Sequence, residues 1–366
     1  MPERTVVTWS ALISGYAEHD CAELALELFR EMKLNGINPD KVTFSSILKA
    51  CSSLNLIGHG TLVHEEIRIN GLQTDVIVGT ALVDMYSKCG EVEVARTVFD
   101  EMPIRNTLSW GAMISGYAQH GYGFSALELF QEMHEKGIKP NKVTFLCILR
   151  ACSSIGMVVH GRWIHSLIIR NGCECVAAIA NTLVGMYAKC GSLIESCKVF
   201  SAIQNPDVVS WAALITGYAQ HGIYKLAMEC IEVMDCRGVM PNGAIFASLL
   251  AACSHSGVIG EGCQSFHNLR EDHYMVPGFE QYSCMIDLFG RGGHLSKAED
   301  VFRTMPSLPN FIATISFLTH CRNFSNVMGK QYCGEATLNF DINNNNQGCL
   351  ISNIVSDVEV QMDKKN

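Results

Sequence analysis

The sequence is poor in charge, and poorer in positive than in negative charge. Charged residues make up 17% of its 366 residues, and 27 Lys and Arg stand against 36 Asp and Glu, for a net charge of −9. Proteins that bind nucleic acid through bulk charge carry an excess of basic residues. The composition therefore excludes a generally basic nucleic-acid binder, and any such contact has to come from the local arrangement of side chains.

The sequence also lacks the motifs of common active sites. It holds no Cys-x-x-Cys pair, no glycine-rich phosphate loop and no serine nucleophile elbow. His64-Glu65-Glu66 has the spacing of half a zinc deaminase site, but that chemistry also needs a Cys-x-x-Cys pair. We interpret His64 as a packing residue and expect no enzyme activity, no metal, no cofactor and no small-molecule substrate. Because no apolar run is long enough to span a membrane, we expect no membrane partner.

Cysteine, by contrast, is plentiful. The 17 cysteines lie within apolar helical stretches, as in Lys49-Ala50-Cys51-Ser52. A free cysteine in such a stretch behaves as a small hydrophobic residue. We therefore expect buried, reduced core residues and a reducing compartment.

A period of 101 residues is the dominant pattern in the chain. Self-similarity of this kind marks a repeat architecture. An array of repeats offers a long surface on which each repeat can contact one unit of a polymer. The residues that recur at this interval are Trp9, Trp110 and Trp211; Tyr16, Tyr117 and Tyr218; Pro39, Pro140 and Pro241; and Cys51, Cys152 and Cys253.

Each period divides into helical hairpins of 35, 35 and 31 residues. In residues 6–40 two apolar stripes follow helical spacing, Asn35-Gly36 ends the second helix, and Pro39 prevents its continuation. One hairpin cannot bury its own apolar stripes, so neighbouring hairpins have to stack. The pattern predicts an all-α fold, a right-handed α-α superhelix (solenoid) of stacked helical hairpins.

The array is expected to hold about nine motifs. Residues 1–5 are interpreted as the remnant of a preceding repeat, because residues 1–4 match residues 102–105. The earlier part of the protein, with any targeting segment, is therefore expected to lie outside this sequence. Residues 311–366 are expected to form a degenerate extension and a frayed tail. The predicted motifs are residues 6–40, 41–75, 76–106, 107–141, 142–176, 177–207, 208–242, 243–278 and 279–310.

The amino-acid sequences of these motifs resemble one repeat family. In the first motif, residues 6–16 (VVTWSALISGY), 25–32 (ALELFREM) and 36–40 (GINPD) closely resemble the pentatricopeptide repeat (PPR) consensus. The alternation of 35, 35 and 31 residues resembles the plant PLS subclass, and residues 82–90 are similar to its short motif. Residues 309–354 are similar, more weakly, to the E-type extension of that subclass, while no DYW deaminase signature occurs.

The resemblance implies that each repeat reads one RNA base. The fifth and last residues of a motif would meet the edge of the base, and the apolar second residue would pack against its face. Val7 and Ile77 are the expected base-sandwiching residues. The basic residues Lys88, Lys189 and Arg291, at one equivalent position of the short motifs, are candidate phosphate contacts. The expected base-reading pairs are Ser10 with Asp40 (guanine), Thr80 with Asn106 (adenine), Asn181 with Asp207 (uracil) and Ser283 with Asn310 (adenine).

Each of these residues also has a purely structural interpretation. A Ser or Asn near a helix start commonly caps the helix, and an Asp after Pro is commonly a turn residue. A Lys or Arg on a helix commonly belongs to a solvated face. The motifs with Gly111 and Ala212 at the fifth position lack a hydrogen-bonding side chain there, so we expect them to discriminate poorly between bases.

The function that the resemblance implies is a sequence-specific, single-stranded RNA-binding adaptor in organellar RNA processing. Recognition of C-to-U RNA editing sites is the expected role, with a DYW-type deaminase or other editing factors acting in trans. The expected location is the mitochondrion or the chloroplast. Two alternatives stay open: a protein-binding α-solenoid scaffold, favoured by the net charge of −9, and a truncated gene product without activity.

Overall fold

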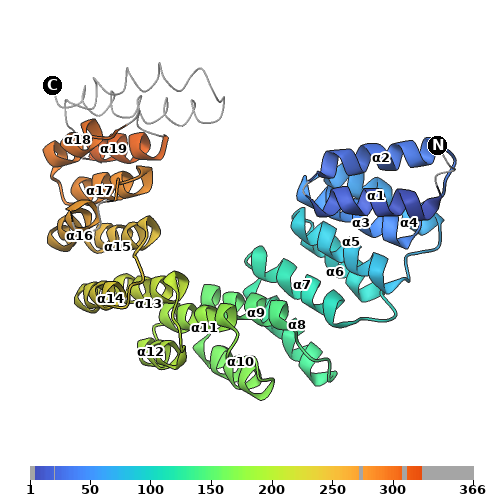
Figure 1. Ribbon diagram of the computed structural model, residues 1–366, viewed down its shortest axis with the longest axis horizontal. Coiled ribbons are helices and arrows are strands. Elements are labelled where there is room, and N and C mark those ends of the chain that lie inside the picture. Colours follow the sequence, from blue (N-terminus) through green and yellow to red (C-terminus); the bar gives the residue numbers. More distant parts are fainter. Residues whose placement is uncertain (1–4, 20, 272–274, 307–310, 324–366) are drawn as a thin grey trace. The chain divides into compact units, whose positions relative to one another are not determined.

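The computed structural model describes residues 5–19, 21–271, 275–306 and 311–323, and their regular structure is entirely helical. Nineteen helices, none of them interrupted by a strand, follow one another within this part of the chain (Figure 1). The predicted all-α architecture of helical hairpins is therefore confirmed. In the same residues, no helix combines the length and the apolar character that crossing a membrane requires.

The chain divides into two compact units between Cys190 and Gly191. The first unit contains five complete hairpins and the first helix of a sixth. Its first helices are α1 (Val6–Glu18), α3 (Lys41–Ser53), α5 (Val76–Lys88), α7 (Thr107–Gln119), α9 (Lys142–Ile155) and α11 (Ala177–Lys189). Its second helices are α2 (Ala22–Leu34), α4 (Ile57–Ile69), α6 (Val92–Glu101), α8 (Gly123–Glu135) and α10 (Val158–Arg170).

The second unit continues the same alternation of first and second helices. Its first helices pack in the order α13, α15, α17 and α19; α14, α16 and α18 pack on the first helices of their own hairpins, and α12 packs on α13. The helices of this unit are α12 (Leu193–Ala202), α13 (Val208–Gln220), α14 (Tyr224–Cys236), α15 (Gly243–Ser256), α16 (Ile259–Glu271), α17 (Phe279–Arg291), α18 (Leu295–Arg303) and α19 (Phe311–Asn323).

The first helices of the first unit form one continuous layer. α1 packs on α3, α3 on α5, α5 on α7, α7 on α9, and α9 on α11. The second helices contact their hairpin partners and, as α2 and α8 do, the first helix of the next hairpin. Stacking of this kind buries the stripes that a single hairpin leaves exposed. The second and fifth residues of the motifs of the first unit lie on this layer of first helices.

The periodic tryptophans are core residues. Trp9 and Trp110 are each 1% exposed, and Trp211 is 3% exposed. Phe99 of α6 meets Trp110 edge-on with ring centroids 5.0 Å apart, and Phe200 of α12 meets Trp211 at 4.6 Å. Edge-to-face pairs of this kind add stability beyond the area that they bury. The recurrence of tryptophan therefore marks the packing between one hairpin and the next.

The periodic cysteines are buried free thiols, as predicted, but the prediction is wrong for Cys21, Cys175 and Cys236, which are exposed. Cys51, Cys152 and Cys253 are fully buried. Burial raises the pKa of the Cys51 thiol to about 11 and that of the Cys152 thiol to about 12. A thiol rather than a thiolate is therefore expected at neutral pH, and such cysteines are inert.

His64 is also a packing residue, as interpreted from the sequence. Its Nδ1 lies 2.9 Å from the Tyr86 hydroxyl, and the equivalent His165 Nδ1 lies 3.0 Å from the Tyr187 hydroxyl. Burial lowers the pKa of both histidines, despite nearby acidic groups that act in the opposite direction. These His–Tyr contacts join the second helix of one hairpin to the first helix of the next.

The predicted helix stop at Asn35-Gly36 is where α2 ends. Gly36 has φ of +70°, a left-handed conformation that favours glycine. Its N–H donates to Lys33 O at 2.9 Å, and the Ile37 N–H donates to Met32 O at 3.2 Å. These bonds satisfy carbonyls that the helix end would otherwise leave without partners.

Candidate functional site

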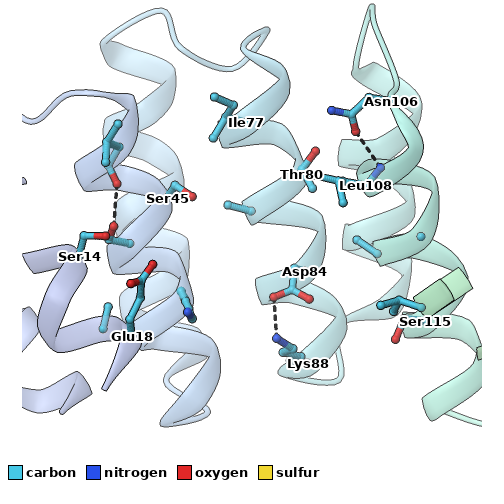
Figure 2. A pocket seen from close by; sticks show the side chains of 18 of the residues that line it. Ser14, Glu18, Ser45, Ile77, Thr80, Asp84, Lys88, Asn106, Leu108 and Ser115 are labelled. Atoms are coloured by element: carbon cyan, nitrogen blue, oxygen red, sulfur yellow. Dashed lines mark hydrogen bonds and ion pairs between the residues drawn. The ribbon is translucent and has the colours of Figure 1, made fainter. Parts of the chain in front are cut away.

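A groove of about 570 Å³ runs across the first helices of the first unit, from α1 to α9 (Figure 2). It lies on the continuous layer that these helices form, and not on the second helices. Its lining combines apolar side chains, small hydroxyl and amide side chains, and the charged residues Glu18, Lys49, Asp84 and Lys88. It is therefore a surface with both apolar and hydrogen-bonding contacts to offer.

A row of exposed apolar residues forms the walls of the groove. Val42, Ile77, Leu108 and Val143 line it, and each is between 45% and 62% exposed. All four are the second residue of a predicted motif, and the equivalent Val7 of α1 is 75% exposed. Single exposed apolar residues are ordinary, but a row at one repeated position marks a binding surface. Ile77 and Val7 thus stand where base-sandwiching residues were predicted, and that role stays a prediction.

The last residue of most predicted motifs caps the first helix of the next hairpin. Its side-chain oxygen accepts a backbone N–H of the first turn, as Asp40 Oδ1 does from Thr43 N at 2.8 Å. Val176, before α11, makes no side-chain cap. The cap interpretation is therefore confirmed for Asn106, and Asp40 and Asp207, interpreted as turn residues, are caps as well. A cap uses only one of the two polar atoms of an Asp or Asn. The capping residues are Asp40, Asp75, Asn106, Asn141, Asp207 and Asn242.

Ser10 and Asp40 lie together, as their predicted pairing requires. The Ser10 hydroxyl lies 3.0 Å from Asp40 Oδ1, 2.7 Å from the Thr43 hydroxyl and 2.8 Å from Val6 O. Ser10 is 5% exposed, whereas Asp40 is half-buried. Burial raises the pKa of the Asp40 carboxyl, but hydrogen bonds from Thr43 and Ser10 outweigh it and lower the pKa overall. Asp40 is thus an ionised acceptor that Ser10 helps to hold in place.

Thr80 and Asn106 both line the groove, on neighbouring first helices (Figure 2). The Thr80 hydroxyl donates to Val76 O at 2.7 Å, which leaves its lone pairs free to accept. Asn106 Oδ1 accepts from Leu108 N at 3.0 Å and from Ser109 N at 2.9 Å. Asn106 Nδ2 has no hydrogen-bond partner within the described part of the chain. The pair therefore presents an acceptor and an unused donor to the same space.

Of the two remaining predicted pairs, one has its residues in different units and the other has one residue outside the described part of the chain. Asn181 of α11 is 9% exposed and belongs to the first unit, while Asp207 caps α13 in the second unit. Ser283 of α17 has a buried hydroxyl for which the described residues provide no hydrogen-bond partner. Its predicted partner Asn310 lies outside the described residues. Base reading by these four residues stays a prediction.

The three candidate phosphate contacts differ in their surroundings. Lys88 Nζ lies 2.7 Å from Asp84 Oδ2, and Arg291 Nε lies 2.8 Å from Asp287 Oδ2. Lys189 is exposed, and no acidic partner is found for it among the described residues. Exposed ion pairs one helical turn apart stabilise a helix by only about 0.3–0.5 kcal/mol. A phosphate could therefore replace Asp84 as the partner of Lys88 and Asp287 as the partner of Arg291. Lys189 could bind a phosphate without first breaking an ion pair to a described residue.

Asp287 is the centre of a buried polar cluster in the second unit. His320 Nε2 of α19 lies 3.0 Å from its Oδ1, and the Ser254 hydroxyl of α15 donates to its Oδ2. Burial raises the pKa of Asp287, but hydrogen bonds from His320, Ser254 and Arg291 outweigh this and hold it well below its usual range. The cluster ties α15, α17 and α19 together. No group of three or more His, Cys, Asp or Glu among the described residues is arranged to hold a metal ion.

Sequence reasoning missed several polar residues of the groove, Ser45, Lys49 and Asn141 among them. These three line it together with the predicted Thr80 and Asn106. Ser45 stands at the fifth position of its motif, so its equivalence to Ser10 was the signal that could have identified it. Lys49 stands outside the positions that the resemblance singles out, and only the packing of α3 between α1 and α5 places it in the groove.

The family models for pentatricopeptide repeats match the chain along most of its described length. The PPR repeat family model matches residues 4–53 and 105–154, and the pentatricopeptide repeat domain model matches residues 202–256. The PPR repeat model matches residues 80–106, 179–205 and 282–308.

Curated relatives point to the same family. A mitochondrial pentatricopeptide repeat-containing protein of Arabidopsis thaliana is 34% identical over 355 residues, which cover 97% of this chain and 57% of the relative. The chloroplastic protein CRR2 of the same plant is 37% identical over 331 residues, which cover 89% of this chain and 50% of the relative. The chain thus spans about half the length of these relatives.

A solved structure shows the same fold. The crystal structure of the pentatricopeptide repeat protein PPR10 from maize has a TM-score of 0.62 to this chain at 19% identity, covering 100% of this chain and 57% of PPR10. Another structure of PPR10, with a TM-score of 0.61, is a complex with an 18-nucleotide psaJ RNA element. The fold is therefore that of an α-solenoid of stacked repeats, and the chain belongs to the pentatricopeptide repeat family.

Proposed function

We propose that this chain binds single-stranded RNA in sequence-specific fashion and acts as an adaptor in organellar RNA processing. The observation that carries the proposal is the groove of the first unit, in which exposed apolar side chains alternate with small polar ones. Bases of a single strand need an apolar contact for their faces and hydrogen bonds for their edges. Membership of the pentatricopeptide repeat family and the RNA complex of PPR10 support the same proposal.

The apolar row supplies the contact with the base faces. Ile77 of α5 and Leu108 of α7 project from neighbouring helices and line the same groove. A flat base between two such side chains buries apolar area on both faces without excluding any of the four bases. Affinity from this contact is therefore independent of sequence, and discrimination has to come from the polar atoms.

The helix caps supply the discrimination between bases. When Oδ1 caps the helix, an Asn leaves its Nδ2 donor and an Asp leaves its Oδ2 acceptor for a ligand. Adenine and cytosine present a ring nitrogen acceptor at the pairing edge, which suits Asn106. Guanine and uracil present a ring N–H, which suits Asp40. This chemistry agrees with guanine for Ser10 with Asp40 and with adenine for Thr80 with Asn106, whereas uracil for Asn181 with Asp207 is proposed from the family resemblance alone.

The finer role that we propose is recognition of C-to-U editing sites. The resemblance of the alternating motifs to the PLS subclass, and of residues 309–354 to its E-type extension, supports this role. Deamination would then be carried out by a DYW-type deaminase or other editing factors in trans. Relatives named for the mitochondrion and for the chloroplast support an organellar location.

The proposal is tested by selection from a pool of random single-stranded RNAs. With one motif per nucleotide, the expected enrichment along the array is guanine, then adenine two motifs later, uracil three motifs further on, and adenine three motifs after that. If the protein bound the selected RNAs no more tightly than poly-uridine, sequence-specific RNA binding would be refuted. In that case the net charge of −9 would favour the protein-binding scaffold.

A further inference from the structure

We propose that a pocket between α8 and α10 binds an arginine side chain of a protein partner. The pocket has a volume of about 370 Å³ and is formed by residues of these two second helices. The groove described above lies on the first helices, so the two sites share no lining residue. The proposal does not depend on RNA binding. The pocket is lined by Gln131, His134, Glu135, Val159, His160 and Trp163.

Trp163 is the one tryptophan that the 101-residue period does not explain. The three periodic tryptophans are buried in the core, whereas Trp163 of α10 is half-buried and lines the pocket. Phe130 and His134 of α8 meet its ring at steep angles, each with the ring centroids 5.6 Å apart. The indole is therefore held in place by two neighbours, while part of its surface stays open to a ligand.

Glu135 supplies the pocket with a carboxylate that no described lysine or arginine neutralises. Its Oε1 accepts a hydrogen bond from Gln131 Nε2 at 2.9 Å, and no ion pair of Glu135 is found within the described part of the chain. Glu132 of the same helix, by contrast, is paired with Lys136 at 2.6 Å. No lysine or arginine is among the described residues that line the pocket. The pocket therefore offers a negative charge that a cationic ligand can pair with.

His160 adds a hydrogen-bonding atom that lacks a partner. Its Nδ1 is buried, and the described residues provide no hydrogen bond for it. Leaving a buried polar atom in this state is unfavourable, and a ligand that supplies the missing bond removes the penalty. In the tautomer protonated at Nε2, this nitrogen is an acceptor. The pocket therefore favours a ligand with several N–H donors.

A guanidinium group meets all of these requirements. It is planar and always charged, it stacks on aromatic rings, and it donates N–H bonds to a carboxylate in a fork. Tryptophan is the aromatic residue that attracts cations most strongly. Val159, which is 69% exposed, stands at the pocket to contact the methylene stem of an arginine. The net charge of −9 also favours a basic partner. RNA carries phosphates that Glu135 would repel, so we assign the pocket to a protein.

The pocket is particular to the second period. The hairpins of the other periods have the same helices, but neither combines an indole with a carboxylate at the two equivalent positions. The fold itself therefore does not require this pair. The equivalents of Trp163 and Glu135 are Leu62 and Leu34 in the first period, and Gln264 and Cys236 in the third.

Fluorine NMR of the full chain labelled with fluorotryptophan tests the pocket. The chain has four tryptophans, and the signal that disappears in Trp163→Leu is that of Trp163. The probes are acetyl-Gly-Arg-Gly-amide and the same peptide with citrulline, which has the shape of arginine but no charge. We expect the arginine peptide to shift the Trp163 signal saturably and to leave the three buried tryptophans unchanged, and we expect a weaker response to citrulline. No shift, or equal shifts with both peptides, would overturn the proposal.

Two substitutions of one charge each test the ion pair. Glu135→Gln should weaken binding of the arginine peptide about 2- to 5-fold, the range of an exposed ion pair. The matched control is Glu128→Gln, which removes an exposed charge of the same helix outside the pocket and should leave the affinity unchanged. Equal effects of the two substitutions would overturn the pairing with Glu135.

The choice of a protein partner over RNA is tested by fluorescence anisotropy. Trp163→Leu places the residue of the first period in α10, and its thermal midpoint shows whether the chain still folds. The folded variant should bind single-stranded RNA from the random pool as tightly as the unmodified chain. A loss of RNA affinity would overturn the assignment to a protein partner. The peptide measurement needs no RNA, so it is decided separately from the proposed function.

Discussion

Asn106→Asp is the substitution that separates the two roles of a capping residue most sharply. Asn106 Oδ1 caps α7 through Leu108 N at 3.0 Å and Ser109 N at 2.9 Å. An aspartate keeps this oxygen, because Asp and Asn are about equally good at the first capping position. Only the second atom changes, from the Nδ2 donor to an acceptor that the groove presents to a ligand. The substitution therefore changes the atom that would read the base and leaves the helix cap, on which folding depends, in place.

The expected magnitudes follow from that geometry. A negative charge at a helix N-terminus stabilises by about 0.3–1 kcal/mol, so the thermal midpoint should stay the same or rise slightly. Adenine, by contrast, would face an acceptor instead of a donor. One lost hydrogen bond with an unsatisfied group costs about 1–3 kcal/mol, which is roughly a 5- to 150-fold loss of affinity. Guanine, a purine of the same size as adenine with a ring N–H in place of the ring acceptor, gains the bond that adenine loses.

The assay is fluorescence anisotropy with four RNAs that differ only at the nucleotide of the third motif. The expected result is a change of preference from adenine to guanine at that nucleotide, with the other positions unaffected. Asn106→Ala is the comparison: it removes the cap at a cost of about 1 kcal/mol and should flatten the preference. If folded Asn106→Asp protein still preferred adenine, the argument that the uncapped atom reads the base would be refuted.

Three further predictions follow from particular contacts. Gly111→Ser should create a preference at the fourth motif, since its hydroxyl would stand where Ser10 contacts the Thr43 hydroxyl in the first motif, with Thr144 shifting slightly because the new Cβ comes within 3.2 Å of its hydroxyl; selection from the RNA pool measures it. The fold lowers the pKa of Asp287, so the ionised carboxylate stabilises the protein above its unfolded pKa of about 4, and this stabilisation is lost as the pH falls from there toward the folded pKa. In urea unfolding, Asp287→Asn should therefore lose less unfolding free energy than the unmodified chain between neutral pH and acid. Trp110→Ala should destabilise the first unit by about 3–5 kcal/mol, whereas Ile77→Ala, at a half-exposed position, should change the thermal midpoint little and weaken RNA binding.

Much of the fold follows from sequence pattern because helical hairpins are local. A hairpin is specified by apolar spacing, a turn glycine such as Gly36 and a stop such as Pro39, all within about 35 residues. The buried tryptophans follow from the same pattern, because a large apolar residue at a fixed position of every period must face the same neighbour. The division into two units at Cys190 could not be foreseen, since the repeat pattern continues across it.

The sequence by itself determined the repeat, its helical type, the core and the family, because each of these depends on residues close together along the chain. Only the tertiary structure decided which polar atoms are available to a ligand. Ser10 and Ser45 stand at equivalent positions, but Ser10 is bonded to Asp40 and Thr43 of the next helix while Ser45 is not. At the third position of the next motif, Thr43 carries the hydroxyl that Ser10 contacts, whereas the equivalent Val78 carries none. A contact between helices of neighbouring hairpins is set by their packing, and packing is what a linear pattern does not contain.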